Sequence, residues 1–123
     1  MIRRETITVS GSTGGAGVST ANATSTNILN GLIRAIYLEH TGTPPSTTDV
    51  TIAGATKDPA SAIMTITDTP VDGWLYPMGA AVNNVEAAIT NQGAPIPVDD
   101  YVKVTIAQAN DADGVIVTIL YEV

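Results

Sequence analysis

The feature that most constrains the fold is the recurrence of Val, Ile or Tyr at every second position near the end of the chain. In residues 101–107 every second residue is Val or Ile, and residues 115–121 repeat the pattern with Val, Ile and Tyr. The polar loop between them ends in Asp113 and Gly114, a dipeptide typical of hairpin turns. A single hairpin is at most marginally stable in water. The chain must therefore supply further strands to cover the apolar face of this one.

Earlier segments show a strand-like composition and are separated by turn residues. The predicted strands are residues 5–10, 18–26, 27–41, 49–54 and 62–67, and the predicted turns are residues 42–46 and 68–73. Within residues 27–41, positions 29, 32, 33 and 36 also fit one face of a helix. Gly31, the β-branched residues and the lack of typical surface-helix residues favour a buried strand instead.

The stretch before the closing hairpin gives weaker signals. Pro95 and Pro97 exclude a central strand at this position, and residues 85–89 allow one short helical turn. No long helix is indicated anywhere. The sequence therefore predicts an all-β fold, a single antiparallel β-sandwich that is jelly-roll-like in its connections.

A chain of 123 residues suits one domain. Residues 11–17 are rich in Gly and carry no side chain that could anchor a core. The sequence therefore predicts an extended N-terminal arm over residues 1–26, with at most one edge strand, which orders against a neighbouring subunit. The β-sandwich domain is expected over residues 27–123.

Composition excludes several classes of function. With no Cys and a single His, the chain cannot build disulfides, thiolate metal sites or multi-histidine zinc sites. A net charge of −7 argues against binding to nucleic acid, and no apolar run approaches the roughly 18 residues that span a membrane. Polar residues follow Arg3 and Arg4 where a signal peptide needs an apolar stretch, so we expect a protein made in the cytosol. We expect no enzymatic activity, no cofactor and no metal.

Two polar motifs suggest chemistry but fit structural roles better. Residues 11–17 lack the Lys of a phosphate-binding loop and the third Gly of a dinucleotide motif, so we interpret them as a linker. Residues 110–114 do not match an EF-hand, although another calcium site, using Asp111, Asp113 and residues 99–100, stays open. The turn interpretation is preferred, with these acids solvated between strands.

The only Trp of the chain, Trp74, lies close to one of the four Tyr, Tyr76, and to Pro77. Such a cluster can stack on a sugar ring, but a lone Trp in a small β domain more often fills the core or an interface. We interpret His40 as a surface or interface residue, because no Gly-x-Ser-x-Gly motif accompanies it.

Four stretches carry a family resemblance: residues 30–38 (NGLIRAIYL), residues 47–52 (TTDVTI), residues 74–77 (WLYP) and the closing hairpin. Together they resemble a group of small structural proteins of tailed bacteriophages. Met78 stands where that group usually has a basic residue after Tyr-Pro. The resemblance covers residues 30–123 and implies a β-sandwich subunit that decorates or cements the phage head as an oligomer.

The resemblance thus implies a non-enzymatic capsid decoration or cement protein that binds the major capsid protein and stabilises the shell. Such a protein is made in the host cytoplasm and lies on the capsid surface of the virion. We expect a homo-oligomer, with a trimer favoured, because a small apolar chain gains from burial between subunits. The alternative is a carbohydrate-binding or host-adhesion module of a phage fibre or tail. The candidate interface residues are Arg3 and Arg4, for docking on an acidic neighbour, and Trp74, Tyr76 and Met78, as buried or interface anchors.

Overall fold

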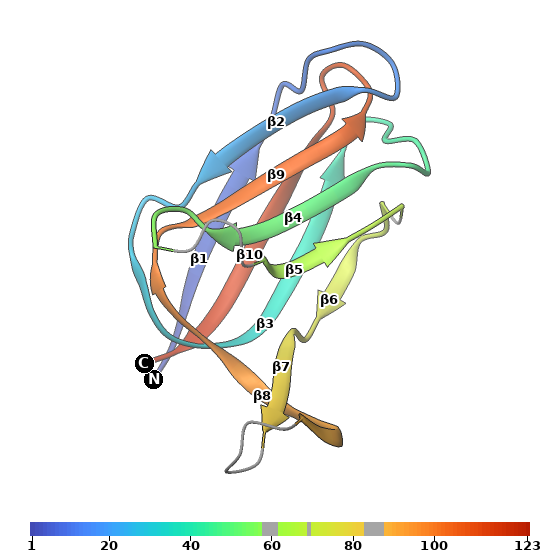
Figure 1. Ribbon diagram of the computed structural model, residues 1–123. Helices are drawn as coiled ribbons and strands as arrows, with labels where there is room; N and C mark the ends of the chain where they lie inside the picture. The colour runs from blue at the N-terminus through green and yellow to red at the C-terminus, as the bar shows by residue number, and fades with distance from the viewer. Residues whose placement is uncertain (58–61, 69, 83–87) are drawn as a thin grey trace.

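The computed structural model describes residues 1–57, 62–68, 70–82 and 88–123, and the regular secondary structure in them is all β (Figure 1). The strands are β1 (Ile2–Val9), β2 (Ser19–Thr24), β3 (Leu29–Thr41), β4 (Asp49–Gly54), β5 (Ala62–Ile66), β6 (Gly73–Leu75), β7 (Met78–Val82), β8 (Ala88–Asp100), β9 (Val102–Ala109) and β10 (Gly114–Glu122). In these residues no helix is long and apolar enough to cross a membrane.

The strands form two antiparallel sheets that pack face to face (Figure 1). One sheet has the order β1-β10-β3-β8-β7, with β6 also paired to β3, and the other has the order β2-β9-β4-β5. The alternation in β9 and β10 turns every second side chain into the core between the sheets, namely Val102, Val104, Ile106, Val115, Val117 and Ile119. The predicted all-β sandwich is therefore confirmed. The largest fully buried side chains include Leu29, Ile33, Ile36, Leu38, Ile52, Ile106 and Ile119.

β3 is a strand, as predicted, and its helix-like spacing has a structural cause. The pairing of β3 with β10 skips one residue, Arg34, and so forms a β-bulge. A bulge shifts the alternation of side chains by one position. As a result, Ile33 and Ile36 both face the core although they are three residues apart, the spacing expected of a helix.

Residues 1–26 differ from the predicted arm. β1 pairs along its length with β10, and β2 pairs with β9, so these residues build an edge of each sheet rather than at most one edge strand. Ile7 and Val9 are buried in the core. The physical reason lies in the closing hairpin, because β9 and β10 each have one edge that only these N-terminal strands cover.

The sequence excludes a central strand around Pro95 and Pro97 but does not predict β8, which runs through both prolines. The strand changes partners here: residues 96–100 pair with β3, and the residues up to Pro95 pair with β7. Each proline thus lies in a stretch paired on one side only, which its missing N–H group permits. The helical turn considered for residues 85–89 falls largely outside the described residues, and Ala88 begins β8.

Candidate functional site

A run of exposed apolar side chains lies along residues 71–78. Val71, Trp74, Tyr76 and Met78 are between 49% and 66% exposed. The short strand β6, which the sequence does not predict, turns Leu75 toward the core and its neighbours outward. Trp74, Tyr76 and Met78 are therefore not core residues, and their role at an interface stays a prediction.

Trp74 packs on Tyr37 of β3. The two residues lie opposite each other where β6 pairs with β3, their ring centroids are 5.0 Å apart, and their ring planes are tilted by 58°. Because Ile36 and Leu38 on either side of Tyr37 are buried, the ring pair lies on the outer face of the six-stranded sheet. Tyr37 is a residue that the sequence analysis missed, since the pairing of β6 with β3 cannot be read from local pattern.

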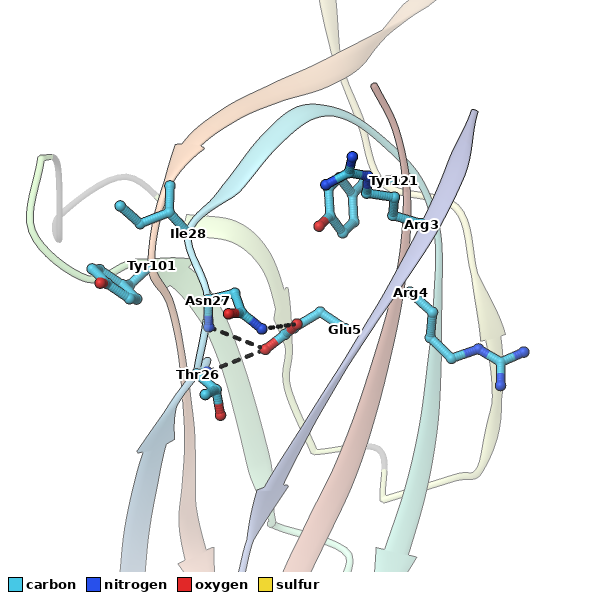
Figure 2. Close-up of a pocket in the computed structure, with 8 residues that line it drawn as sticks. All are labelled: Arg3, Arg4, Glu5, Thr26, Asn27, Ile28, Tyr101 and Tyr121. Carbon is cyan, nitrogen blue, oxygen red and sulfur yellow. Dashed lines mark hydrogen bonds between the residues drawn. The ribbon is translucent and has the colours of Figure 1, made fainter.

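Arg3 and Arg4, which were expected to dock together, point to opposite sides of β1. Arg3 lies opposite the buried Tyr121, and Arg4 lies opposite Leu120. Figure 2 shows the Arg3 side chain beside Tyr121, whereas the Arg4 side chain extends away from it. Both residues line the groove between the sheets, but their side chains lie on opposite sides of β1.

The groove beside Arg3 has a volume of about 680 Å³ and is open to solvent (Figure 2). Glu5 is buried at this groove, and its carboxylate accepts hydrogen bonds from the backbone N–H groups of Thr26 and Asn27, at 3.1 and 3.4 Å, and from Asn27 Nδ2 at 3.4 Å. Glu5 thus ties β1 to the connection between β2 and β3. The other lining residues are Arg4, Ile28, Tyr101 and Tyr121.

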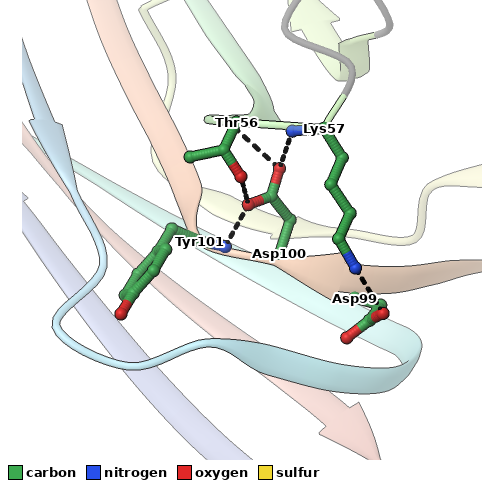
Figure 3. Close-up of polar contacts among 5 residues, drawn as sticks. All are labelled: Thr56, Lys57, Asp99, Asp100 and Tyr101. Carbon is green, nitrogen blue, oxygen red and sulfur yellow. Dashed lines mark hydrogen bonds and ion pairs between the residues drawn. The ribbon is translucent and has the colours of Figure 1, made fainter.

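Asp99 and Asp100 were both expected to be solvated turn acids, and this is wrong for Asp100. Asp100 is buried and accepts hydrogen bonds of 2.5 to 2.8 Å from the backbone N–H groups of Thr56, Lys57 and Tyr101 and from the Thr56 hydroxyl (Figure 3). These donors, the Lys57 N–H and the Thr56 hydroxyl foremost, hold the pKa of Asp100 well below its usual range. Asp99 is exposed and forms an ion pair with Lys57 Nζ at 2.6 Å.

A second acidic cluster, in the loop between β9 and β10, fastens the Gly-rich loop that follows β1. Asp111 accepts hydrogen bonds from Ser19 Oγ at 2.6 Å and from the Gly15 N–H at 3.0 Å. Both bonds lower the pKa of Asp111. Asn110 Oδ1 accepts a bond of 3.0 Å from the Gly17 N–H. The loop is therefore held to the closing hairpin by side-chain acceptors.

The alternative calcium site does not assemble. Asp111 and Asp113 follow β9 and residues 99–100 precede it, so the two pairs are about 26 Å apart along a strand of eight residues. Asp113 is itself buried and accepts hydrogen bonds from the backbone N–H groups of Thr43 and Asn110. Among the residues described, no group of three or more His, Asp or Glu side chains could hold a metal ion.

His40 lies near the end of β3, opposite Val115, and both of its ring nitrogens are buried. Neither nitrogen has a hydrogen-bond partner in the described part of the chain. Burial lowers the pKa of the imidazole, against the opposing effect of the nearby Asp72 and Asp113 carboxylates. The ring therefore has no hydrogen-bonded hydroxyl group that it could activate as a base.

Comparison with protein-family models, with curated proteins and with solved structures finds no match for this chain. Function is therefore inferred from the surfaces described above. These are the exposed apolar run of residues 71–78, the outer sheet face that carries Trp74, and the groove beside Arg3.

Proposed function

We propose that this protein is a non-enzymatic structural protein of a bacteriophage virion, which decorates the capsid and stabilises the shell by binding the major capsid protein. The observation that carries the proposal is the exposed apolar run of residues 71–78, a surface suited to docking. In this proposal the protein is made in the host cytoplasm and joins the capsid surface as a homo-oligomer, with three copies favoured. The choice of the capsid shell as the partner rests on the family resemblance.

A jelly-roll-like connection of the strands belongs to the proposal. The orders β1-β10-β3-β8 and β2-β9-β4-β5 place the first strand beside the last in one sheet, and successive strands β1 to β4 alternate between the sheets. Eight strands divided in this way support a jelly roll, with β6 and β7 as additions. Jelly rolls are typical of viral capsid domains and of lectins.

The ribbon formed by β7 and residues 88–95 of β8 supports docking to a large partner. It projects from the sandwich (Figure 1), and Met78 is its first residue. Neither of its strands, residues 78–82 and 88–95, contains a charged residue, in a chain whose net charge is −7. Since a lone two-stranded ribbon is at most marginally stable in water, a partner surface would stabilise it.

Cryo-electron microscopy of native particles of the phage that encodes the chain tests the proposal. We expect density for the sandwich on the capsid shell, at contacts between major capsid subunits. Density on tail fibres alone, or no density in purified particles, would overturn the assignment to the capsid.

Two variants locate the docking residues on particles stripped of the protein. Tyr76→Ser and Met78→Ser should each raise the dissociation constant for the shell by about tenfold or more, because both remove exposed apolar anchors. Val18→Ser is the matched control, since Val18 is 65% exposed in the connection between β1 and β2, which lies at the opposite end of the sandwich from the ribbon (Figure 1). Cosedimentation with the particles measures all three, and equal binding by the control and the two variants would contradict docking through this run.

A second candidate function, a carbohydrate-binding or host-adhesion module, is favoured by one observation. Trp74 offers an exposed aromatic surface beside Tyr37, and aromatic faces stack on sugar rings. Trp74→Ala distinguishes the candidates by glycan-array binding and light scattering. Loss of glycan binding with an unchanged oligomer would favour adhesion, and a wild-type protein that binds no glycan would reject it.

A further inference from the structure

The two outer faces of the sandwich differ in chemistry. The outward side chains of the four-stranded sheet are small or polar: Thr20, Asn22 and Thr24 on β2, Thr51 on β4, Thr65 on β5, and Lys103 and Thr105 on β9. The outward side chains of the six-stranded sheet include large apolar ones: Ile2 on β1, Leu32 and Tyr37 on β3, Trp74 on β6, and Ile116 and Leu120 on β10. We call the latter surface the apolar face.

The register places the apolar face in rows across the strands. Thr118 lies at its centre, between Thr6 of β1 and Tyr37 of β3, and Trp74 continues the same row. Leu120 lies two residues along β10 in one direction and Ile116 two residues in the other. Apolar side chains thus flank the central row on both sides.

The charges of the apolar face are separated between its two ends. Arg4 pairs across the strands with Leu120, and close to it Arg34 forms an ion pair with Glu122. Glu39 lies opposite Ile116, at the other end. Within the described residues, neither Arg4 nor Glu39 has an ion-pair partner. The outward side chains of β1, β3 and β10 thus carry two positive and two negative charges, and Asp99, which faces outward on β8, is neutralised by its ion pair with Lys57. These charges balance, although the chain as a whole carries a net charge of −7.

We infer that the apolar face packs against the corresponding face of a second copy of this chain, with the Arg4 end of one copy against the Glu39 end of the other. A neutral face lets two acidic chains approach, and an apolar centre with a charged rim is the usual composition of a protein interface. If the Arg4 ends of the two copies lay against each other, two arginines would come into contact. The opposite alignment pairs unlike charges in a twofold dimer. A ring of three would pair them by joining the Arg4 end of each face to the Glu39 end of the next.

This inference deepens the proposed function, because it names the surface through which the copies associate. It leaves the ribbon and the Tyr76–Met78 region free to contact the shell. Association is measured on the free protein, without particles, so a failure here does not bear on shell binding.

A matched pair of variants tests the surface. Thr118 and Thr105 are both half-buried threonines on the central strands of their sheets, one on the apolar face and one on the opposite outer face. Thr118→Arg should raise the dissociation constant between copies by about 30-fold or more, whereas Thr105→Arg should leave it unchanged. Sedimentation velocity at concentrations up to about 100 μM measures both, and circular dichroism checks that both are folded.

Two results would overturn the inference: a wild-type protein that stays monomeric at about 100 μM, or a Thr118→Arg variant that associates like Thr105→Arg. If the wild type is monomeric and Thr118→Arg loses binding to particles, the apolar face contacts the shell instead.

Charge reversal tests the alignment without disturbing the apolar centre. Arg4→Glu and Glu39→Arg should each weaken association by about tenfold, because each places like charges in contact. The double variant should recover the wild-type dissociation constant. If the assembly is a dimer, an equimolar mixture of the two single variants should recover it as well. A double variant that associates as weakly as the single ones would overturn the proposed alignment.

Discussion

Asp99 and Asp100 are neighbours in the chain, but in the described part of the structure only Asp100 is held by backbone donors. Asp100→Asn keeps the size of the side chain and leaves it one acceptor oxygen instead of two. We expect this change to lower the melting temperature by several degrees, because at least one buried donor loses its partner. Asp99→Asn, the control, removes an exposed ion pair and should leave the melting temperature nearly unchanged. Thermal unfolding followed by circular dichroism measures both, and equal melting temperatures would contradict the role of Asp100.

His40 makes stability depend on pH. Its pKa in the folded chain is lowered from the ordinary value of 6.5. Below that pH the unfolded chain takes up a proton that the folded chain does not, so the free energy of unfolding is highest above pH 6.5 and falls as the pH drops toward the lowered pKa. Urea unfolding at about pH 7.5 and about pH 5.5 should show this fall in the wild type.

The control for this prediction is His40→Leu, which keeps an apolar side chain in the same place and removes the titrating group. The urea midpoint of this variant should be the same at both pH values. At the higher pH its free energy of unfolding should be between zero and about 1 kcal/mol greater than that of the wild type, because two unpaired buried nitrogens are removed. Asp100 and Asp111 titrate below this window, because their pKa values are lowered. A pH dependence that survives in His40→Leu would assign it to another group.

At the residue scale, the sequence predicts that acids lie between strands but not which of them are buried. Asp100 is buried because the pairing of β4 with β9 brings the backbone of Thr56 and Lys57 against it. That pairing joins segments far apart in the chain. Exposed interface candidates were easier to name, since Trp74, Tyr76 and Met78 stand out by residue type alone.

At the scale of elements, β1 gives the sharpest test of how the N-terminal residues contribute. Removing residues 1–10 leaves β10 with an open edge and uncovers Val115 and Val117 in the core. We expect the shortened chain to show no cooperative unfolding transition in urea. An extended arm could be removed without this effect, so a shortened chain that unfolds with the wild-type midpoint would restore that interpretation.

Substitutions on the exposed side of β1 are the control for this deletion. Thr6→Ser and Thr8→Ser keep the strand and its pairing, and each should change the free energy of unfolding by less than about 1 kcal/mol.

Long alternating strands were predictable, and the irregular ones were not. β9 and β10 follow from alternation alone, because a half-buried strand needs an apolar residue at every second position. The bulge at Arg34 is a property of the pair β3–β10, and β6 exists because Trp74 and Leu75 pair with β3. The bulge leaves only the spacing of Ile33 and Ile36, which fits a helix equally well, and β6 leaves no local pattern.

At the scale of the molecule, the two-sheet architecture follows from the same alternation, since strands with one apolar face must pack against other strands. The distribution of residues between the two outer faces does not follow from it. Ile116 and Thr105 each occupy an outward position, and only the register shows that they belong to different sheets. The contrast that carries the interface inference therefore becomes visible only in three dimensions.

β1 and β10 are partners in a sheet although one is the first strand and the other the last. During synthesis β1 leaves the ribosome long before its partner, and pairing between such distant segments closes slowly. Throughout that delay β1 is an unpaired strand able to join another nascent chain. Charged residues discourage such pairing, and Arg3, Arg4 and Glu5 lie at its beginning. The two arginines thus also protect the unfinished chain from aggregation while it waits for its own last strand.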